Sequence, residues 1–430
     1  MFDRVYRQRL EADLAQWETD GVITPAARIA ISGALPPLTS GISIPVVVAI
    51  VGGLLIAAAF LAFVAAHWTD FARLLRFAIL VAGIIAANSI GAWFARSNRP
   101  VLADLCASVG AIIFGAGIAL VGQMYHLSGD FAAGVLLWAA GALVTAALTG
   151  SRGALAVALV AGSIWSVMRV VDAYSFSGAL AVPHLPFVAF WLVSASLAIA
   201  WNSRVAAHLV ALATFPWWIM AAVQISDASH KEVLFLFVLA NGATLFFGGG
   251  LALAAVPRQR ARDAGMVLSI YGALSLAGIA ILEMIMASVV SMSAAATVQP
   301  RWVVSFGVAG AILAFATSAM TRQAGAFFAG LAIALILFVA TIWTAPQMGQ
   351  PWPIYLVGLC AMLSLVVSGM LHASRPRVVA GWFGIAGAIT TITWALKGSL
   401  LYRSAFLAAA GIVAIVLAMV LNRLLPRADR

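Results

Sequence analysis

The chain has 430 residues, of which 64% are hydrophobic and 9% are charged, and its formal net charge at pH 7 is +10. A soluble domain has about 25% charged residues, so this composition excludes an ordinary aqueous fold and predicts a protein whose solvent is lipid. The basic residues stand singly between apolar runs. This pattern favours a role in orienting the protein in a membrane, and we expect no nucleic-acid partner.

The sequence contains none of the common signatures of a cofactor or metal protein. Its two cysteines, Cys106 and Cys360, fall inside apolar runs and give neither a disulfide framework nor a metal-ligand spacing. A P-loop and a dinucleotide fingerprint are also missing, so we expect no cofactor. The first ten residues are charged and lack an apolar core, which argues against a cleavable signal peptide.

Residues 1–43 differ from the rest of the chain because charged residues alternate with apolar ones. Apolar side chains recur there at helical spacing, namely Tyr6, Leu10, Leu14 and Trp17. Gly21 ends this helix, and Thr24-Pro25 is typical of the start of a second one that stops near Gly33. We expect residues 1–43 to form a cytoplasmic amphipathic helical hairpin with a cytoplasmic partner. A helix that lies on the membrane surface remains the alternative.

The remainder, residues 44–430, reads as a transmembrane domain of an all-α, polytopic protein. A bilayer core of about 30 Å needs roughly 20 apolar residues per helix, and fourteen such runs follow one another. Their limits are 44–66, 75–95, 101–121, 131–149, 153–171, 184–201, 205–225, 232–256, 264–288, 301–320, 324–344, 352–373, 378–396 and 401–422.

Basic residues predict the orientation of these spans. With the N-terminus in the cytoplasm, 17 of the 24 Lys and Arg residues fall on the inner side and 7 on the outer side. Because cytoplasmic loops of membrane proteins are enriched in Lys and Arg, we expect both termini to be cytoplasmic and the connection 122–130 to be extracytoplasmic.

Two short pairs of residues recur along the chain. Gln123-Met124 recurs as Gln347-Met348, and Ser151-Arg152 recurs as Ser374-Arg375. The two offsets are nearly equal, and each corresponds to eight spans and preserves orientation. They are compatible with a parallel repeat of six helices, two linking helices and six more, which is a known transporter plan.

Several segments of the first third of the chain resemble one bacterial family. They are Leu14–Thr24 with Pro25–Ile31, Ala65–Trp68, Arg73 and Arg76, Gly115–Leu120, Gln123–His126, Gly129-Asp130 and Trp138. Together they are similar to the predicted membrane proteins called domain of unknown function 2157. The resemblance implies a protein of the bacterial inner membrane and supplies no activity.

The first polar cluster follows the first span. It consists of His67, Asp70, Arg73 and Arg76, and the last three recur at the spacing of one helix face. An interfacial anchor explains Trp68 and the charges. Against it, both arginines lie on the side that basic residues avoid, at a helix N-terminus where the dipole disfavours cations. An anionic group of the protein or of a ligand would hold them there.

The second cluster is the polar connection between the third and fourth spans. Gln123, Tyr125, His126 and Asp130 follow one another closely, with Ser128-Gly129 favouring a tight turn and Asp130 favouring a cap of the fourth span. A capped helical hairpin is the alternative to a binding site. The spacing of His126 and Asp130 is one residue short of the acyltransferase His-x4-Asp motif. One His and one Asp are also too few for a zinc site, so we expect no metal.

Glu283 stands in the outer part of the ninth span. A carboxylate inside the membrane is costly unless it is paired or hydrated, and it indicates a functional site by default. A structural ion pair is the alternative, with Arg169 or Arg301 at similar outer depth as the partner.

We therefore expect an integral inner-membrane protein, transporter-like, with a polar site open to the extracytoplasmic face and an unknown small solute or lipid-linked substrate. The candidate substrate-binding residues are His67, Asp70, Arg73, Arg76, Gln123, Tyr125, His126, Asp130 and Glu283. Two alternatives remain. One is an outer-leaflet enzyme that uses His126 as a base on a phosphate-bearing or lipid-linked substrate. The other is a non-catalytic scaffold in the lipid bilayer. No residue is assigned a catalytic role.

Overall fold

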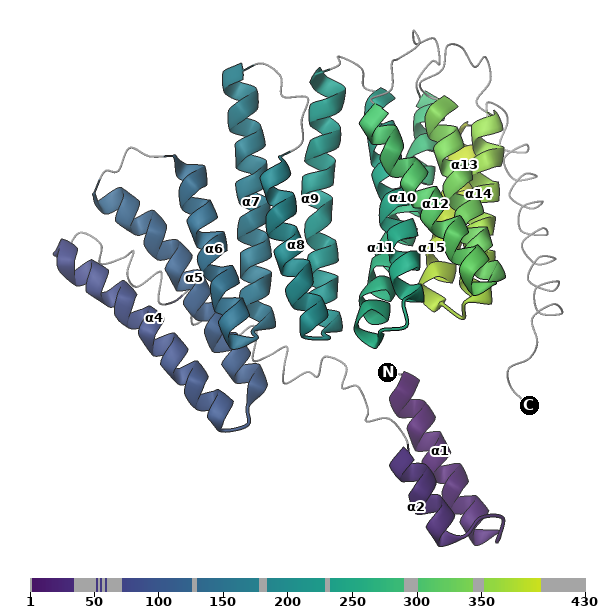
Figure 1. Cartoon of the computed structure of the whole chain (residues 1–430), viewed down its shortest axis with the longest axis horizontal. Coiled ribbons are helices and arrows are strands. Elements are labelled where there is room, and N and C mark those ends of the chain that lie inside the picture. The colour runs from purple at the N-terminus through teal and green to yellow at the C-terminus, as the bar shows by residue number, and fades with distance from the viewer. Residues whose placement is uncertain are drawn as a thin grey trace. The chain divides into compact units, whose positions relative to one another are not determined.

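A computed structural model of the chain describes residues 2–34, 52, 55, 59, 72–125, 130–177, 184–228, 233–289, 301–342 and 352–395. These residues form helices and no strands, as an all-α fold requires. The helices (Figure 1) are α1 (Phe2–Thr19), α2 (Pro25–Ala34), α4 (Arg73–Arg96), α5 (Pro100–Met124), α6 (Phe131–Thr149), α7 (Arg152–Ser177), α8 (Leu185–Ala200), α9 (Arg204–Ala228), α10 (Val233–Ala255), α11 (Gln259–Val289), α12 (Arg301–Thr321), α13 (Ala324–Ile342), α14 (Trp352–Leu371) and α15 (Arg375–Ala395).

Eleven helices of the described residues are long and apolar enough to cross a membrane: α4 to α7 and α9 to α15. Each coincides with one of the fourteen predicted runs. The first and last predicted runs, 44–66 and 401–422, lie outside the described residues apart from positions 52, 55 and 59. The repeated pair Gln347-Met348 lies outside them as well, so the parallel repeat stays a prediction.

The sixth predicted span is shorter than expected. Helix α8 has 16 residues, or about 24 Å at 1.5 Å per residue, against the roughly 30 Å of a bilayer core. Pro186 occupies its first turn, and Asn202, with φ of 50°, follows its end. Both residues limit the helix, because proline favours a helix start and a left-handed backbone interrupts helical hydrogen bonding.

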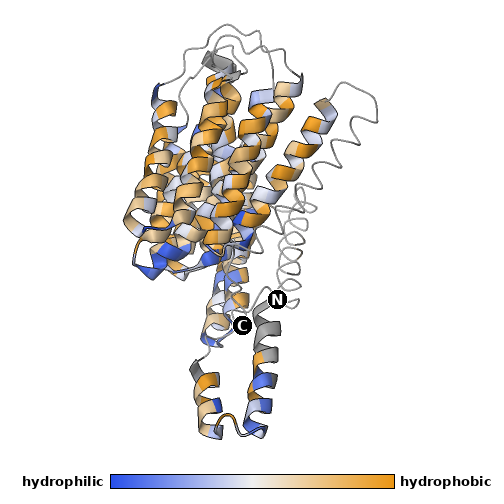
Figure 2. Cartoon of the chain, turned by 90° about the vertical axis from the view of Figure 1, so that its right-hand side faces the viewer, coloured by the Kyte–Doolittle hydropathy of each residue, from blue (hydrophilic) through white to orange (hydrophobic). Residues whose placement is uncertain are grey.

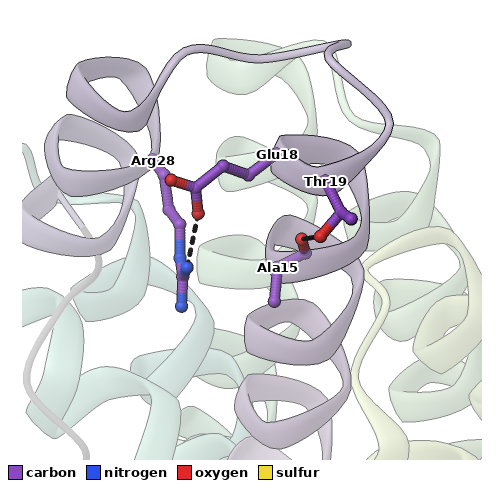
Figure 3. A network of polar contacts seen from close by, with 4 residues as sticks. All are labelled: Ala15, Glu18, Thr19 and Arg28. Carbon is purple, nitrogen blue, oxygen red and sulfur yellow. Dashed lines mark hydrogen bonds and ion pairs between the residues drawn. The ribbon is translucent and has the colours of Figure 1, made fainter.

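The chain forms two compact units, residues 1–113 and 114–430, and the division falls within α5. In the first unit, α1 and α2 pack together as a helical hairpin around Gly21, whose φ is 72°. Thr24 caps α2 by accepting a hydrogen bond from the Ala27 N–H at 3.2 Å, as the Thr-Pro pair predicted. Arg28 and Glu18 form an ion pair of 2.5 Å across the hairpin (Figure 3).

Helices α4 and the first part of α5 meet at small residues within the same unit. A Cβ atom added at Gly91 would lie 3.1 Å from the Cys106 Cβ atom, and one added at Gly110 would lie 2.8 Å from Asn88 Nδ2. Asn88 donates to the Ile84 carbonyl of its own helix, at 2.9 Å. A carbonyl four residues back thus satisfies this amide, in place of the interhelical hydrogen bond that a polar residue in a membrane helix would predict.

The second unit has its core around α10. This helix packs most extensively against α11 and α12, and it also contacts α9 and α13. Large side chains from these helices are fully buried there, including Phe237, Phe247, Leu276 and Ile336. Figure 2 shows that the helices of this unit are hydrophobic along their lengths, with hydrophilic residues gathered at their ends.

Glycine brings the backbones of α10, α11 and α12 into direct contact. A Cβ atom added at Gly248 of α10 would lie 2.0 Å from the Gly310 carbonyl oxygen of α12. A Cβ atom added at Gly250 of α10 would lie 2.6 Å from the Ser269 nitrogen of α11. One added at Gly272 of α11 would lie 2.5 Å from the Phe247 Cα atom of α10. Lipid tails are as apolar as leucine, so helices in a membrane associate through such close packing.

Gly248→Ala should therefore separate α10 from α12 and lower the melting temperature in detergent by several degrees, because a helix backbone cannot yield as a flexible side chain can. Gly249→Ala is a matched control, since a Cβ atom there meets nothing within 4 Å. Alanine is favoured over glycine in a helix by up to about 1 kcal/mol, so the control should melt at the same temperature or slightly higher. Equal melting temperatures for the two variants would contradict the close contact.

Candidate functional site

An ion pair marks one end of the second unit. Asp130 precedes α6 and caps it, because its Oδ1 atom accepts a hydrogen bond from the Ala133 N–H at 3.3 Å. Its Oδ2 atom pairs with Nη2 of Arg169, which lies in α7. The cap was predicted from the sequence. The partner was not, since Arg169 was named only as one of two possible partners of Glu283.

The pair controls the charge of the exposed Asp130 carboxyl. Partial desolvation raises its pKa, but the hydrogen bond and charge of Arg169 and the backbone N–H of Ala133 outweigh this effect and hold the pKa below its usual value. Asp130 is therefore ionised at neutral pH. It neutralises an arginine that would otherwise be an isolated cation near the end of a membrane helix.

His184 connects this end of α7 with α8 and α9. Its Nδ1 atom lies 3.1 Å from the Ser166 hydroxyl, and its ring meets the Trp165 ring edge-on at 4.6 Å. Its backbone carbonyl accepts a hydrogen bond of 2.9 Å from Trp217 Nε1. Three helices therefore meet at the start of α8.

These contacts place the start of the short helix α8 deep between its neighbours. Ser166 lies about three helical turns before the end of α7 at Ser177, and Trp217 lies about three turns before the end of α9 at Ala228. At about 5.4 Å per turn, α8 begins about 16 Å short of both ends. This shortfall leaves room beside α9 that a full-length helix would fill.

A partly open cavity of about 480 Å³ lies between α8, α9, α10, α11 and α12. Its lining is almost wholly apolar and rich in aromatic rings, among them Trp191, Phe215, Trp217, Trp218, Phe246 and Phe306. Leu185, Ile219 and Leu282 of the lining are also exposed at the surface, by 60%, 41% and 42%. Its size and lining are typical of small-molecule sites.

The aromatic side chains that line the cavity pack against one another. The rings of Trp217 and Trp218 lie 5.6 Å apart, and Trp218 lies 6.0 Å from Phe306. A Cβ atom added at Gly242 would lie 1.9 Å from the Trp218 ring, so this glycine allows the indole to lie flat against α10. Trp191 is anchored by its Nε1 atom, which donates to the Val210 carbonyl at 2.9 Å.

Glu283 lies beside the cavity wall, one residue after Leu282 and one turn after Ile279. It is fully buried, and neither carboxyl oxygen has a hydrogen-bond partner. It also makes no ion pair with any described residue, and Arg169 pairs with Asp130 instead. The alternative of a structural ion pair with Arg169 is therefore wrong.

Gln224 of α9 lies at the same level as Glu283 of α11. The two helices are in register, because Arg204 pairs with Asp263 at 3.1 Å and the stretch from Arg204 to Gln224 is as long as the stretch from Asp263 to Glu283. Gln224 is also buried, and its side-chain oxygen has no hydrogen-bond partner. Two polar side chains at one depth thus have unsatisfied oxygens, which is costly in an apolar interior unless a further group binds them.

The remaining predicted site residues are not brought together by the described structure. His67, Asp70 and His126 lie outside the described residues. Arg73 begins α4 and Arg76 is half-buried in it, within the first unit. Gln123 and Tyr125 are exposed at the end of α5, and no contact that the structure records joins them to Asp130 or Glu283. Among the described residues, no group of His, Cys, Asp and Glu could hold a metal ion.

Sequence reasoning missed Ser166, His184 and the aromatic cavity. His184 carried a usable signal, because it stands between Pro183 and Pro186 at the start of an apolar run, where helices begin. The aromatic residues carried none, since a Trp or Phe in an apolar helix can equally face lipid.

Eleven described helices that are long and apolar enough to cross a membrane define a polytopic membrane protein. A comparison with known families agrees: the family described as Predicted membrane protein (DUF2157) matches residues 15–155, which confirms the resemblance found in the sequence. No curated protein and no solved structure matches the chain.

Glu283→Gln keeps the shape of the side chain and removes its ability to ionise. Because no described cation depends on Glu283, we expect the melting temperature in detergent to stay the same or rise by a few degrees. Gln224→Glu is the converse variant at the same level. It should lower the melting temperature, because a second ionisable group is placed in an apolar interior. A fall of several degrees for Glu283→Gln would reveal a cationic partner.

Proposed function

We propose that this chain is a transporter-like protein of the bacterial inner membrane that binds an amphipathic, lipid-like molecule from the extracytoplasmic side. The cavity between α8 and α12 would hold the hydrocarbon part. The polar groups around Arg169 and His184 would face the headgroup. The main observation behind this proposal is the apolar, aromatic cavity of about 480 Å³, whose edge at Leu185 and Trp217 adjoins His184.

The character of the lining supports a hydrocarbon ligand. Hydrogen-bonding side chains of the lining, such as Thr214 and Ser275, bond to carbonyls of their own helices at 3.3 and 2.8 Å, so few groups remain to fix a polar solute. Burying an apolar chain against aromatic and aliphatic side chains is favourable without further partners. Ile219 and Leu282 of the lining are exposed, which suits a ligand that arrives from the bilayer.

The neighbouring polar groups support a headgroup at the outer end. Arg169 and Asp130 form their ion pair there, and the Ser166 hydroxyl contacts His184 one turn nearer the cavity. Arginine binds phosphate and carboxylate oxygens through its planar fork. An anionic headgroup that displaced Asp130 from Arg169 would keep the guanidinium paired while its chain entered the cavity.

The proposal includes the orientation of the second unit in the membrane. Six arginines of the second unit, Arg152, Arg204, Arg258, Arg260, Arg262 and Arg375, begin or connect helices at the end opposite Asp130. The hydrophilic residues at the lower ends of the helices in Figure 2 belong to this arginine-bearing end. By the positive-inside rule this end faces the cytoplasm, and Asp130 faces outward.

Two cysteine variants in a background without Cys106 and Cys360 test the orientation. In spheroplasts, we expect the thiol introduced by Tyr125→Cys to react with a membrane-impermeant maleimide. The thiol introduced by Pro257→Cys should react only after lysis. Both positions are exposed in the structure, so access decides the outcome. The reverse pattern would invert the topology and place the proposed headgroup site in the cytoplasm.

Filling the cavity tests the function. Gly278 of α11 lines it, and a Cβ atom added there meets nothing within 4 Å, so Gly278→Leu should extend a side chain into the cavity without disturbing helix packing. We expect at least a 10-fold loss of binding of a phosphatidylglycerol with a pyrene-labelled acyl chain, measured by energy transfer from tryptophan. Transfer of the same lipid between leaflets of proteoliposomes should slow by a similar factor.

The matched control is Gly249→Leu, the same substitution at another glycine whose added Cβ atom meets nothing, outside the cavity lining. It should retain binding and transfer within about 2-fold. Equal binding by the two variants would exclude the cavity as the site. Binding without transfer in the wild-type protein would exclude the transporter and favour the scaffold or the enzyme.

A further inference from the structure

A second buried charge lies at the opposite, arginine-bearing end of the second unit. Arg377 belongs to the first turn of α15, and 5% of its surface is exposed. Its Nη2 atom donates to the Ser269 hydroxyl of α11 at 2.9 Å, and its guanidinium carbon lies 5.8 Å from the centre of the Phe247 ring of α10. Its Nε and Nη1 atoms are buried without a hydrogen-bond partner.

No acidic residue of the described helices is paired with this charge. Between Glu283 and Asp429 the chain contains no Asp or Glu, so α12 to α15 carry none. Glu283 lies about four turns after Ser269 along α11, or about 21 Å away at 1.5 Å per residue. Asp263, near the start of α11, is paired with Arg204. A buried guanidinium without a carboxylate is strongly unfavourable unless another anion binds it.

Two serine hydroxyls belong to the helices that pack against the start of α15. Ser368 of α14 is fully buried, and its hydroxyl has no hydrogen-bond partner. It precedes Gly369, where an added Cβ atom would lie 3.1 Å from the Arg377 carbonyl carbon, so the two residues belong to adjoining turns. Ser269 contributes its hydroxyl from α11. Hydroxyls and a guanidinium fork together are suited to an oxyanion with several acceptor oxygens.

His372 adds no second positive charge beside Arg377. Its Nδ1 atom contacts the Ser368 carbonyl at 3.1 Å, and its Nε2 atom contacts Gln323 Oε1 at 3.1 Å. Burial lowers the pKa of His372, and the charge of Arg377 lowers it further, against the opposing effect of the Ser368 carbonyl. The imidazole is therefore neutral at pH 7.

We infer that Arg377, Ser269 and Ser368 form a binding site for a phosphate-type oxyanion on the arginine-bearing side of the membrane. The Nε and Nη1 atoms of the guanidinium present N–H donors that no described acceptor satisfies, and the oxygens of such an anion would accept from them. Phospholipid headgroups and free phosphate share this chemistry.

The test uses the full chain in detergent and measures its melting temperature. Inorganic phosphate is compared with sodium chloride at equal ionic strength. Phosphatidylglycerol in mixed micelles is compared with diacylglycerol of the same chains, which lacks the phosphate. At a probe concentration near one hundred times its Kd, we expect a rise of about 3 °C for a chain of this size. A rise with both probes assigns the site to phosphate in general, and a rise with the lipid alone assigns it to a headgroup.

Three variants locate the effect. Arg377→Lys keeps a charge and loses the fork, so the rise should fall by at least half. Ser269→Ala removes one hydroxyl and should weaken the rise even if Arg377→Lys fails to fold. Arg258→Gln removes an exposed arginine at the same end and should keep the full rise. The site is excluded if neither probe stabilises the wild-type protein above its control. It is also excluded if Ser269→Ala and every folded Arg377 variant respond as the wild type does.

Discussion

Direct backbone contact at α10 is the constraint on which the second unit depends. The hydrophobic effect cannot drive helices together when the solvent is itself apolar, so close approach has to supply the stabilisation. Gly248 and Gly272 carry no side chains, so α12 and α11 can approach the backbone of α10 directly. The same device at Gly242 admits the Trp218 ring against α10. Small residues thus decide both where helices touch and where large aromatic side chains gather.

The cavity follows from this arrangement combined with the length of α8. Tight packing around α10 fixes α11 and α12, whereas α8 begins level with Trp217 and leaves the C-terminal part of α9 without that neighbour. Aromatic rings line the resulting space without filling it. His184 adjoins the cavity, because it precedes Leu185 of the lining and its carbonyl accepts from Trp217 of the lining. Arg169 lies one turn after Ser166, whose hydroxyl contacts His184. The start of one short helix therefore connects the apolar cavity with the polar residues of α7.

Much of the fold could be predicted from the sequence, because apolar runs of about 20 residues leave few alternatives to membrane helices. The caps at Thr24 and Asp130 followed from local rules and are present. The pairing of Asp130 with Arg169 could not be predicted, since it depends on which helices pack together. Periodicity is also uninformative where all faces of a helix are apolar, so the cavity lining was indistinguishable from lipid-facing surface. The burial of Arg377 was hidden for the same reason: its position suggested an ordinary cytoplasmic arginine.

The two buried charges cannot neutralise each other. Ser269, which holds Arg377, and Glu283 lie on the same helix with about 21 Å between them, too far for a direct contact in any packing of α11. Moving the charges together would require breaking the glycine contacts that fix α11 against α10. Each charge therefore has to be compensated where it stands: Glu283 by protonation or a cationic group beside the cavity, and Arg377 by an anion at the other end. The second unit thus holds one buried ionisable group towards each end of α11, and each is compensated separately.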